Sequence, residues 1–398
     1  MEPKIRFSSS NILYEEKTLS EISTINPKTN VPLEFEYVDL ESVSGTEMTN
    51  HRTEHKATAP SRAQRLAKKG DIFYQTVRPY QKNNYYFDMD DDNYVFSTGY
   101  AQIRPSIYGK YLFTLLQNDS FLKQVLDNCA GTSFPAINPS VLSRLSVRIC
   151  KDKQEQQAIA SYFTSLDSQI SASTSRLASL KQMKAASLQA MFPQEGETVP
   201  KIRFKGVEGE WKTCPLYHFA KKRIEKNTKM LYNITLTNSA EFGIIDQRNF
   251  FDHEISNSEN INGYYVVRDH DFVYNPRISS SAPVGPINQN KLGYTGVMSP
   301  LYLVFEINGI NRDFLEIFFH TTLWHKYMFD NGNTGARFDR LAISDEDFMK
   351  MPIPDIDIDE QQAIASYFTS LDRQISLQSQ RLEKLKQIKS ACLDKMFV

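Results

Sequence analysis

Apolar residues recur at alternating spacings of four and three in two segments of the chain, which is the pattern of a helix that packs along a seam. The first segment, residues 155–192, has no glycine or proline, and its seam positions are Ile159, Phe163, Leu166, Ile170, Leu177 and Leu180. Residues 360–397 repeat them as Ile364, Phe368, Leu371, Ile375, Leu382 and Leu385. Each segment of 38 residues predicts one helix of about 57 Å. Polar residues interrupt the seams at Ser173, Lys184, Gln378 and Lys389, which is typical of positions that fix register.

The two segments are near copies at an offset of 205 residues. They are identical at 26 of 38 positions, including an unbroken stretch from Glu155 to Asp167. A shorter echo, PKIRF, stands at residues 3–7 and again at 200–204. The repeat unit is therefore half of the chain, and it ends in the long helix.

The rest of each half repeats its elements but few of its residues. The stretch KKGDIFYQTVRPYQKN (68–83) lines up with RDHDFVYNPRISSSAP (268–283), and both place an aspartate before an apolar strand and an arginine after it. Likewise GTSFPAINPSVLSRLSVRI (131–149) parallels GARFDRLAISDEDFMKMPIPDI (335–356). Tyrosine, phenylalanine, valine and isoleucine runs broken by glycine and proline indicate strands and turns with some helix. We expect two copies of one α+β fold.

The linker between the halves decides how the two helices run. Only about eight residues, PQEGETVP, follow the first helix, so the second domain must lie at the far end of that helix and its own helix must run back. The expected fold is α+β, with two similar globular domains joined by two long antiparallel coiled-coil helices in pseudo-two-fold symmetry. The expected segments are a first domain (1–153), a first helix (154–192), a linker (193–200), a second domain (201–358) and a second helix (359–398).

The charges of the chain nearly cancel, with 46 lysines and arginines against 47 aspartates and glutamates and a formal net charge of -1. This excludes a uniformly basic nucleic-acid coat protein and an acidic tail. Two local segments are nevertheless basic. Residues 51–82 hold eight basic against two acidic side chains, and residues 201–230 hold nine against three.

No pattern in the sequence predicts catalysis or metal binding. The four cysteines have no CxxC spacing, the seven histidines form no HExxH pair, and no GxxxxGK[ST] loop occurs, so catalytic and metal-ligating residues are predicted to be none. YNPRI at 274–278 lacks the second proline of an amino-methyltransferase motif, and PDIDIDE at 354–360 lacks the lysine of a nuclease motif. Without a signal-peptide core or a run of 18 apolar residues, we expect a cytoplasmic protein that does not enter a membrane.

The double half-repeat, PKIRF, the paired strands GDIFYQTVRP and HDFVYNPRIS, and EQQAIASYFTSLD at the start of each helix together resemble the specificity subunit of type I restriction-modification enzymes. This resemblance covers essentially the whole chain. It implies that the two domains are target recognition domains, each reading one half of an asymmetric bipartite site in double-stranded DNA. It also implies that the helices set the spacing of the half-sites and dock two methyltransferase subunits.

The resemblance implies a non-catalytic chain without a cofactor of its own. The partner subunits would supply the chemistry of a site-specific adenine methyltransferase with S-adenosylmethionine. Where restriction subunits are present, they would add an endonuclease that uses ATP and magnesium. Two alternatives stay open at this point: a symmetric protein-binding scaffold without DNA readout, and the specificity subunit of a combined methyltransferase-nuclease.

Candidate DNA-binding residues lie in the basic segments and in the loops that follow the paired strands, since basic side chains position a duplex and Arg, Asn and Gln read base edges. In the first half they are Lys68, Lys69, Tyr74, Gln75, Arg78, Lys82, Asn83, Asn84 and Thr132. In the second half they are Lys221, Lys222, Arg223, Tyr274, Asn275, Arg277, Ser279, Ser280, Asn333 and Arg337. The recurrence of SYFTSLD exceeds what packing requires. It predicts two equivalent partner-docking sites at Tyr162, Phe163, Asp167, Tyr367, Phe368 and Asp372.

Overall fold

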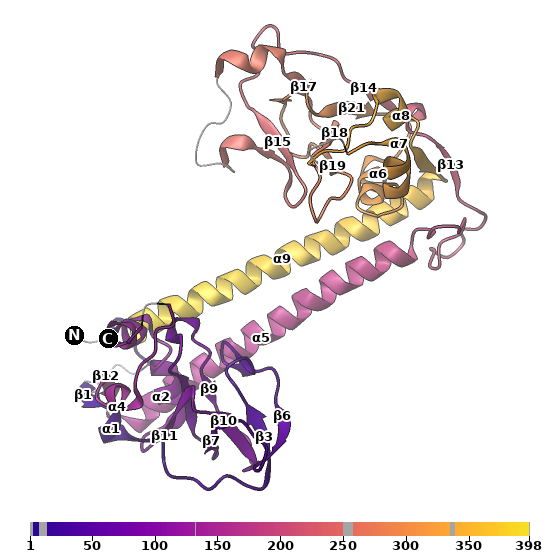
Figure 1. Ribbon diagram of the computed structural model, residues 1–398. Helices are drawn as coiled ribbons and strands as arrows, with labels where there is room; N and C mark the ends of the chain where they lie inside the picture. The colour runs from indigo at the N-terminus through magenta and orange to yellow at the C-terminus, as the bar shows by residue number, and fades with distance from the viewer. Residues whose placement is uncertain (1–2, 8–13, 132, 250–257, 335–338, 398) are drawn as a thin grey trace. The chain divides into compact units, whose positions relative to one another are not determined.

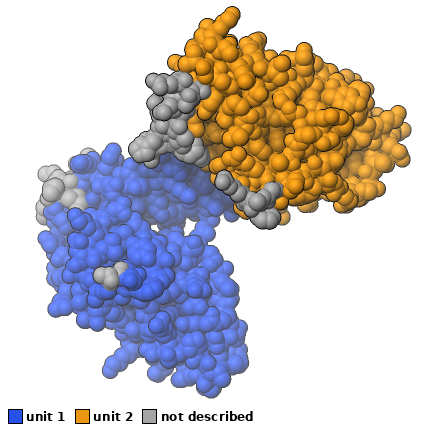
Figure 2. Space-filling view, turned by 45° about the horizontal axis from the view of Figure 1, so that its top comes forward, with its two compact units in different colours: residues 1–175, 379–398 blue, residues 176–378 orange. Residues whose placement is uncertain are grey.

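The computed structural model describes residues 3–7, 14–131, 133–249, 258–334 and 339–397. The chain forms two compact units, coloured separately in Figure 2. Unit 1 consists of residues 1–175 and 379–398, and unit 2 consists of residues 176–378. Each unit thus takes the beginning of one long helix and the end of the other. The compact units cut across the segments expected from the sequence for this reason.

Unit 1 contains two four-stranded sheets. The strands of the first, in spatial order, are β2 (Ser23–Ile25), β11 (Tyr100–Pro105), β8 (Ile72–Gln75) and β9 (Tyr85–Tyr86). The strands of the second are β6 (Arg52–His55), β3 (Glu34–Val38), β10 (Tyr94–Ser97) and β7 (Ala63–Leu66), grouped in the indigo-to-purple part of Figure 1. All neighbours pair antiparallel except β10 and β3.

Short elements complete unit 1. The paired strands are β1 (Tyr14–Thr18) with β12 (Ser146–Cys150), and the hairpin β4 (Val43–Ser44) with β5 (Glu47–Met48). The helices are α1 (Leu19–Ile22), α2 (Gly109–Leu115), α3 (Asp119–Asp127), α4 (Pro139–Leu142) and the 3-10 turn η1 (Pro79–Gln81). One core lies where the first sheet meets α2, α3 and the long helices, and a second includes the stacked rings of Phe73 and Phe96, 3.6 Å apart.

Unit 2 repeats the first sheet of unit 1. Its strands, in spatial order, are β14 (Ala220–Lys222), β21 (Leu303–Ile307), β18 (Phe272–Tyr274) and β19 (Ile287–Gln289). Three antiparallel pairs accompany it: β13 (Lys212–Pro215) with β22 (Pro352–Asp355), β15 (Leu236–Ser239) with β16 (Gly243–Asp246), and β17 (Tyr265–Val267) with β20 (Gly296–Met298). The helices are α6 (Arg312–Phe319), α7 (His325–Asn331) and α8 (Asp345–Met349), with 3-10 turns η2 (Leu216–His218), η3 (Gln247–Asn249) and η4 (Ser258–Gly263).

The order of strands confirms the expected α+β fold in two similar copies. In both halves, the strand that follows the aspartate (β8 or β18) pairs on one side with β11 or β21 and on the other with β9 or β19. In both halves, a strand near the start of the domain pairs with the strand that leads into the long helix. The halves differ beside this shared sheet. Unit 1 has a second four-stranded sheet there, whereas unit 2 has two-stranded pairs.

The long helices are α5 (Lys153–Ala190) and α9 (Ile358–Met396), and they pair antiparallel within each unit. In unit 1, Asp167 near the start of α5 forms an ion pair of 2.5 Å with Lys389 near the end of α9. In unit 2, Asp372 near the start of α9 forms the equivalent ion pair, also 2.5 Å, with Lys184 near the end of α5. The two lysines that interrupt the apolar seams therefore have carboxylate partners across the helix pair. Among the residues that the structure describes, no helix has the length and apolarity needed to cross a bilayer.

Candidate nucleic-acid interface

Two loops meet beyond the carboxyl end of β8 in unit 1. The loop that follows β8 and the loop near Gly131 join through a backbone bridge between Val77 and Ala136. The Arg78 amide donates to the Pro135 carbonyl oxygen over 2.8 Å, and the Ile137 amide donates to the Thr76 carbonyl oxygen over 3.0 Å. The structure thus brings together two segments that the sequence proposed separately.

The equivalent loops also meet in unit 2. Arg277, in the loop after β18, bridges Arg340, and the Leu341 amide donates to the Pro276 carbonyl oxygen over 2.9 Å. A cavity of about 320 Å³ opens here, lined by Asn275, Arg277 and Ser279, by Arg340, and by residues 237–240 at the end of β15. Its two arginines come from segments more than 60 residues apart. The sequence reasoning missed Arg340, although it stands three residues after the predicted Arg337.

The predicted cationic side chains have different surroundings. The guanidinium of Arg78 lies over the ring of Phe134, with 4.4 Å from its central carbon to the ring centroid. Lys82 pairs with Asp119, Lys69 pairs with Asp90 over 2.6 Å, and Lys222 pairs with Asp345. Such surface ion pairs contribute little to stability, typically about 0.2–1 kcal/mol. A phosphate can therefore compete for these lysines. The side chains of Lys68, Lys221, Arg277, Ser280 and Asn333 are exposed.

Four predicted DNA-binding residues are buried and leave the candidate interface: Tyr74, Gln75, Asn84 and Tyr274. The Tyr274 ring stacks on Phe348 at 4.9 Å, and its hydroxyl donates to the Val284 carbonyl oxygen over 3.0 Å. The ring of Tyr74 packs in the core of unit 1 beside Phe121. Both tyrosines stand on strands whose side chains alternate between faces that are both covered, so their rings fill the core.

The predicted amides bond within their own loops and to neighbouring segments of the same unit. In unit 1 the Asn84 side-chain oxygen accepts from the Gln75 amide over 2.8 Å, and the Asn83 side-chain oxygen accepts from the Gly45 amide over 2.9 Å. In unit 2 the Asn275 side chain donates to the Asn238 carbonyl oxygen over 2.9 Å and accepts from the Arg277 amide over 3.0 Å. The hydroxyl of Ser279 caps a turn by accepting from the Ala282 amide. These side chains shape the loops that carry Arg78 and Arg277.

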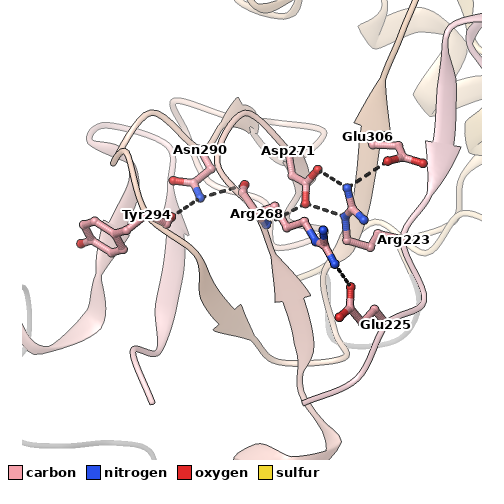
Figure 3. Close-up of polar contacts among 7 residues, drawn as sticks. All are labelled: Arg223, Glu225, Arg268, Asp271, Asn290, Tyr294 and Glu306. Carbon is pink, nitrogen blue, oxygen red and sulfur yellow. Dashed lines mark hydrogen bonds and ion pairs between the residues drawn. The ribbon is translucent and has the colours of Figure 1, made fainter. Parts of the chain in front are cut away.

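Arg223 is held by carboxylates and not presented to solvent. It makes two hydrogen bonds of 2.6 and 2.9 Å to Asp271, the aspartate that precedes β18, and an ion pair of 3.0 Å with Glu306 (Figure 3). Asp271 also accepts from the Arg268 amide over 2.7 Å, which closes a tight turn. Burial raises the pKa of Asp271, although the hydrogen bonds from Arg223 act in the opposite direction. This ion pair withdraws Arg223 from the predicted phosphate contacts.

The predicted partner-docking residues also have internal roles. Phe163 and Phe368 are 1% and 0% exposed and fill the cores of units 1 and 2, so neither ring offers a surface. The hydroxyl of Tyr162 lies 3.4 Å from the Cys392 sulfur, and that of Tyr367 lies 2.9 Å from the Ser187 hydroxyl. Asp167 and Asp372 form the ion pairs with Lys389 and Lys184. Two of the predicted DNA-binding residues, Thr132 and Arg337, lie outside the described residues.

The repeated EQ pair at the start of each helix joins the helix to its domain. Glu155 accepts from the Phe7 amide over 3.0 Å, and Glu360 binds Arg203 through two hydrogen bonds of 2.9 and 2.7 Å. Both glutamates are buried and hold the PKIRF segment of their own half. The next residue of each helix also accepts a hydrogen bond. Gln156 accepts from the backbone amide of Tyr108, just before α2, and Gln361 accepts from that of Asn311, just before α6. The exact recurrence of EQQ and PKIRF is therefore explained by a joint built twice.

Comparison with known proteins identifies similar proteins for part of the chain. A model described as Type I restriction modification DNA specificity domain matches residues 11–182. The type I restriction enzyme HindI specificity subunit of Haemophilus influenzae is 34% identical over 139 residues, which cover 33% of this chain and 30% of that protein. The chain thus aligns with less than a third of that relative. The resemblance stated from the sequence is confirmed.

Solved structures share the fold over the whole chain. The S subunit of the type I restriction-modification system from M. genitalium covers 100% of this chain, which in turn covers 99% of it, with a TM-score of 0.61 at 14% identity. A chain from a study of complex assembly and conformational transition of the type I R-M system is 19% identical. It has a TM-score of 0.55 and coverage of 98% of both chains. At these identities the likeness is one of fold.

Proposed function

We propose that the whole chain is the DNA-sequence-recognition subunit of a type I restriction-modification complex, on the premise that residues 11–182 match the model described as Type I restriction modification DNA specificity domain. The family supports a role in recognising DNA sequence, and its specificity subunits are not catalytic. Each unit reads one half of a bipartite site. The observation that carries the proposal is the equivalent meeting of loops beyond β8 and β18, through the Val77–Ala136 and Arg277–Arg340 bridges.

The two half-sites differ in sequence under this proposal. The loops share their backbone connections but present different side chains, with Arg78 beside Phe134 in unit 1 and Arg277 beside Arg340 in unit 2. Lysines such as Lys68 and Lys221 contact phosphates and fix the position of the duplex, which carries no sequence information. In unit 2, Arg277 reads guanine in the major groove through two hydrogen bonds, as arginine does, whereas the loop of unit 1 presents the Phe134 ring beside its arginine. Different arginine settings therefore predict an asymmetric target.

The helices supply two equivalent faces for methyltransferase subunits. Near the start of α5 and of α9, identical polar side chains lie exposed beside the buried aromatic residues: Ser161, Thr164 and Ser165 on α5, and Ser366, Thr369 and Ser370 on α9. Because these positions are exposed, the internal joint does not account for their recurrence. Tyr162 and Tyr367, both half-buried, border the same faces. Two copies of one partner can bind such faces equivalently.

The chemistry belongs to the partners in this account. S-adenosylmethionine would be held by the methyltransferase subunits, and ATP with magnesium by restriction subunits where the complex contains them. Within the described part of the chain, no cluster of histidine, cysteine, aspartate or glutamate has the arrangement of a metal site. This chain would contribute target choice and the spacing between half-sites.

Titration of DNA affinity against salt tests this function. The full chain would be bound to its methyltransferase partner and mixed with duplexes that carry or lack the target. We expect affinity to fall steeply with salt, because phosphate contacts release counterions, and to exceed non-specific affinity by at least about a thousandfold at physiological salt. Affinity without sequence preference or salt dependence would favour the protein-binding scaffold instead.

A further inference from the structure

Phe134 is a large apolar side chain that unit 1 leaves in solvent. It stands in the loop near Gly131, and 61% of its surface is exposed. The other phenylalanines of the neighbouring core, such as Phe121, are buried. Exposure alone is not unusual, since Leu33 and Leu231 are more exposed. What sets Phe134 apart is its place in the candidate interface, against the guanidinium of Arg78.

The loop holds this ring in a fixed place. Ala130 and Ala136 exchange two backbone hydrogen bonds of 2.9 and 3.0 Å across the base of the loop. Gly131 adopts a φ of +88°, and a side chain there would lie 3.2 Å from the Phe134 carbonyl oxygen. The amide of Arg78 donates to the Pro135 carbonyl oxygen next to the ring. Backbone contacts thus anchor the chain on both sides of Phe134.

Arg78 lies against the ring. Its backbone has a φ of +54°, in the left-handed region that residues with a side chain rarely adopt. This conformation accompanies a guanidinium held over the Phe134 ring at 4.4 Å. Among the described residues, no carboxylate forms an ion pair with Arg78. The pair therefore combines an exposed aromatic face with an uncompensated positive charge.

This combination suits nucleic acid. Bases stack on aromatic side chains, and apolar side chains that enter the duplex separate neighbouring base pairs. Phenylalanine has no polar atom and cannot read a base edge, whereas a guanidinium beside it can contact a phosphate. A protein partner would require a larger apolar patch, and the loop from Ala130 to Ala136 carries Phe134 as its only large side chain.

We propose that Phe134 and Arg78 form a stacking wedge for DNA. In the complex, the Phe134 ring packs on a base of the half-site bound by unit 1, and the Arg78 guanidinium contacts the phosphate beside that base. The wedge adds affinity by deforming a base step, and its preference follows how easily that step unstacks. This inference rests on the proposed function of unit 1 in DNA recognition.

The experiment uses the full chain in complex with its methyltransferase partner. Affinity is measured for duplexes with the intact target and with a scrambled unit 1 half-site, and 2-aminopurine placed along that half-site reports unstacking. Phe134→Ala should weaken binding to the intact target about tenfold to a hundredfold and abolish the fluorescence rise, since stacking contributes about 1–3 kcal/mol per base. Phe134→Trp should keep the affinity for the intact target and the fluorescence rise within a few fold of the wild-type values.

Further variants separate the parts of the wedge. Arg78→Ala should weaken binding and reduce the slope of log affinity against log salt by about one, as the loss of one phosphate contact predicts. Leu33→Ala is the matched control, because Leu33 is an apolar residue of unit 1 with 83% exposure outside both loops. It should bind as the wild type does. Size-exclusion chromatography before DNA is added checks that each variant still assembles with the methyltransferase.

The outcomes distinguish this inference from the function on which it rests. If the wild-type complex shows no preference for the intact target, the proposed function itself fails. If the wild type is selective and Phe134→Ala binds equally well with unchanged fluorescence, the wedge is overturned and the function stands. Loss of the methyltransferase from Phe134→Ala would also overturn the wedge, because it would identify the ring as a protein contact.

Discussion

The turn before β8 in unit 1 and the turn before β18 in unit 2 have the same backbone conformation but are closed by different side chains. In each, a buried aspartate, Asp71 or Asp271, accepts the amide of the residue three positions earlier and binds an arginine through two hydrogen bonds. The arginine is Arg104 of β11 in unit 1, whereas in unit 2 it is Arg223, which follows β14. The residue before the aspartate has positive φ in both, as Gly70 and as His270.

This difference shows which parts of the repeat are fixed. Around the sheet, the aspartate and the backbone turn recur, while the partner that neutralises the carboxylate comes from another strand. At the start of the long helices, Glu155 and Glu360 each bind the PKIRF segment of their own half, through the Phe7 amide and the Arg203 side chain respectively. Divergence is thus greater in the domains than in the long helices, which are identical at 26 of 38 positions. This is the arrangement expected of two readers of different half-sites on one shared frame.

Removal of Arg223 should give the largest effect. Arg223→Ala leaves Asp271, which is 3% exposed, as a buried carboxylate whose described donor is the Arg268 amide. Breaking a buried pair in this way costs about 3–5 kcal/mol. Both tryptophans of the chain, Trp211 and Trp324, lie in unit 2, so urea unfolding followed by tryptophan fluorescence measures the loss there.

Arg104→Ala is the matched variant in unit 1 and should cost less. Asp71 would keep the Gln102 side chain at 2.7 Å and the Lys68 amide at 2.9 Å as donors. Hydrogen exchange of peptides around β8 and β11 measures this loss. An Arg223→Ala protein with unchanged unfolding and weakened DNA binding would restore Arg223 to the interface and contradict the comparison.

The residue before each aspartate should give a smaller effect of opposite sign in the two units. Gly70→Ala forces a side chain into the left-handed region and should destabilise unit 1 by about 1 kcal/mol. His270→Gly relieves the same strain in unit 2, where φ is +69°. It should stabilise that unit by a few tenths of a kcal/mol, since glycine also loses more entropy on folding. Hydrogen exchange in each unit checks the signs, and equal effects of one sign would contradict the shared turn.

The smallest effect concerns pH and unit 2. Because burial raises the pKa of Asp271 above its ordinary value, the folded state binds this proton more tightly than the unfolded state. The contribution is fully present below the unfolded pKa, near 3.9, and is lost as pH rises through the folded pKa. Asp271→Asn removes it. The difference in unfolding free energy between wild type and variant, followed by tryptophan fluorescence from pH 3 upward, should therefore shift toward the variant as pH rises.

The sequence predicted the architecture well because the architecture rests on repetition and periodicity. The seam from Ile159 to Leu180 and the offset between Glu155 and Glu360 are local patterns, and Lys184 and Lys389 pair where the antiparallel arrangement requires. The residues of the candidate site were harder to predict from the sequence. A count of charges in residues 201–230 contains no information that Arg223 meets Asp271, 48 residues away in the chain.

Phe163 and Phe368 were misjudged, and Phe134 was not singled out from the sequence, each for a physical reason. Phe163 and Phe368 recur identically, and recurrence alone cannot separate a core position from a surface that binds a partner. Phe134 resembles a core phenylalanine in sequence. Its exposure follows from the Gly131 turn and from the left-handed backbone of Arg78, which pairs with the loop from more than 50 residues away.

Methylome sequencing of cells that express this chain with its methyltransferase partner tests the central claim most directly. The account predicts one methylated motif made of two short, dissimilar half-sites separated by a spacer without sequence preference. Replacing the loops around Arg78 with the equivalent loops of another specificity subunit should change one half-site and leave the other intact. A single continuous motif, or no motif, would contradict the account.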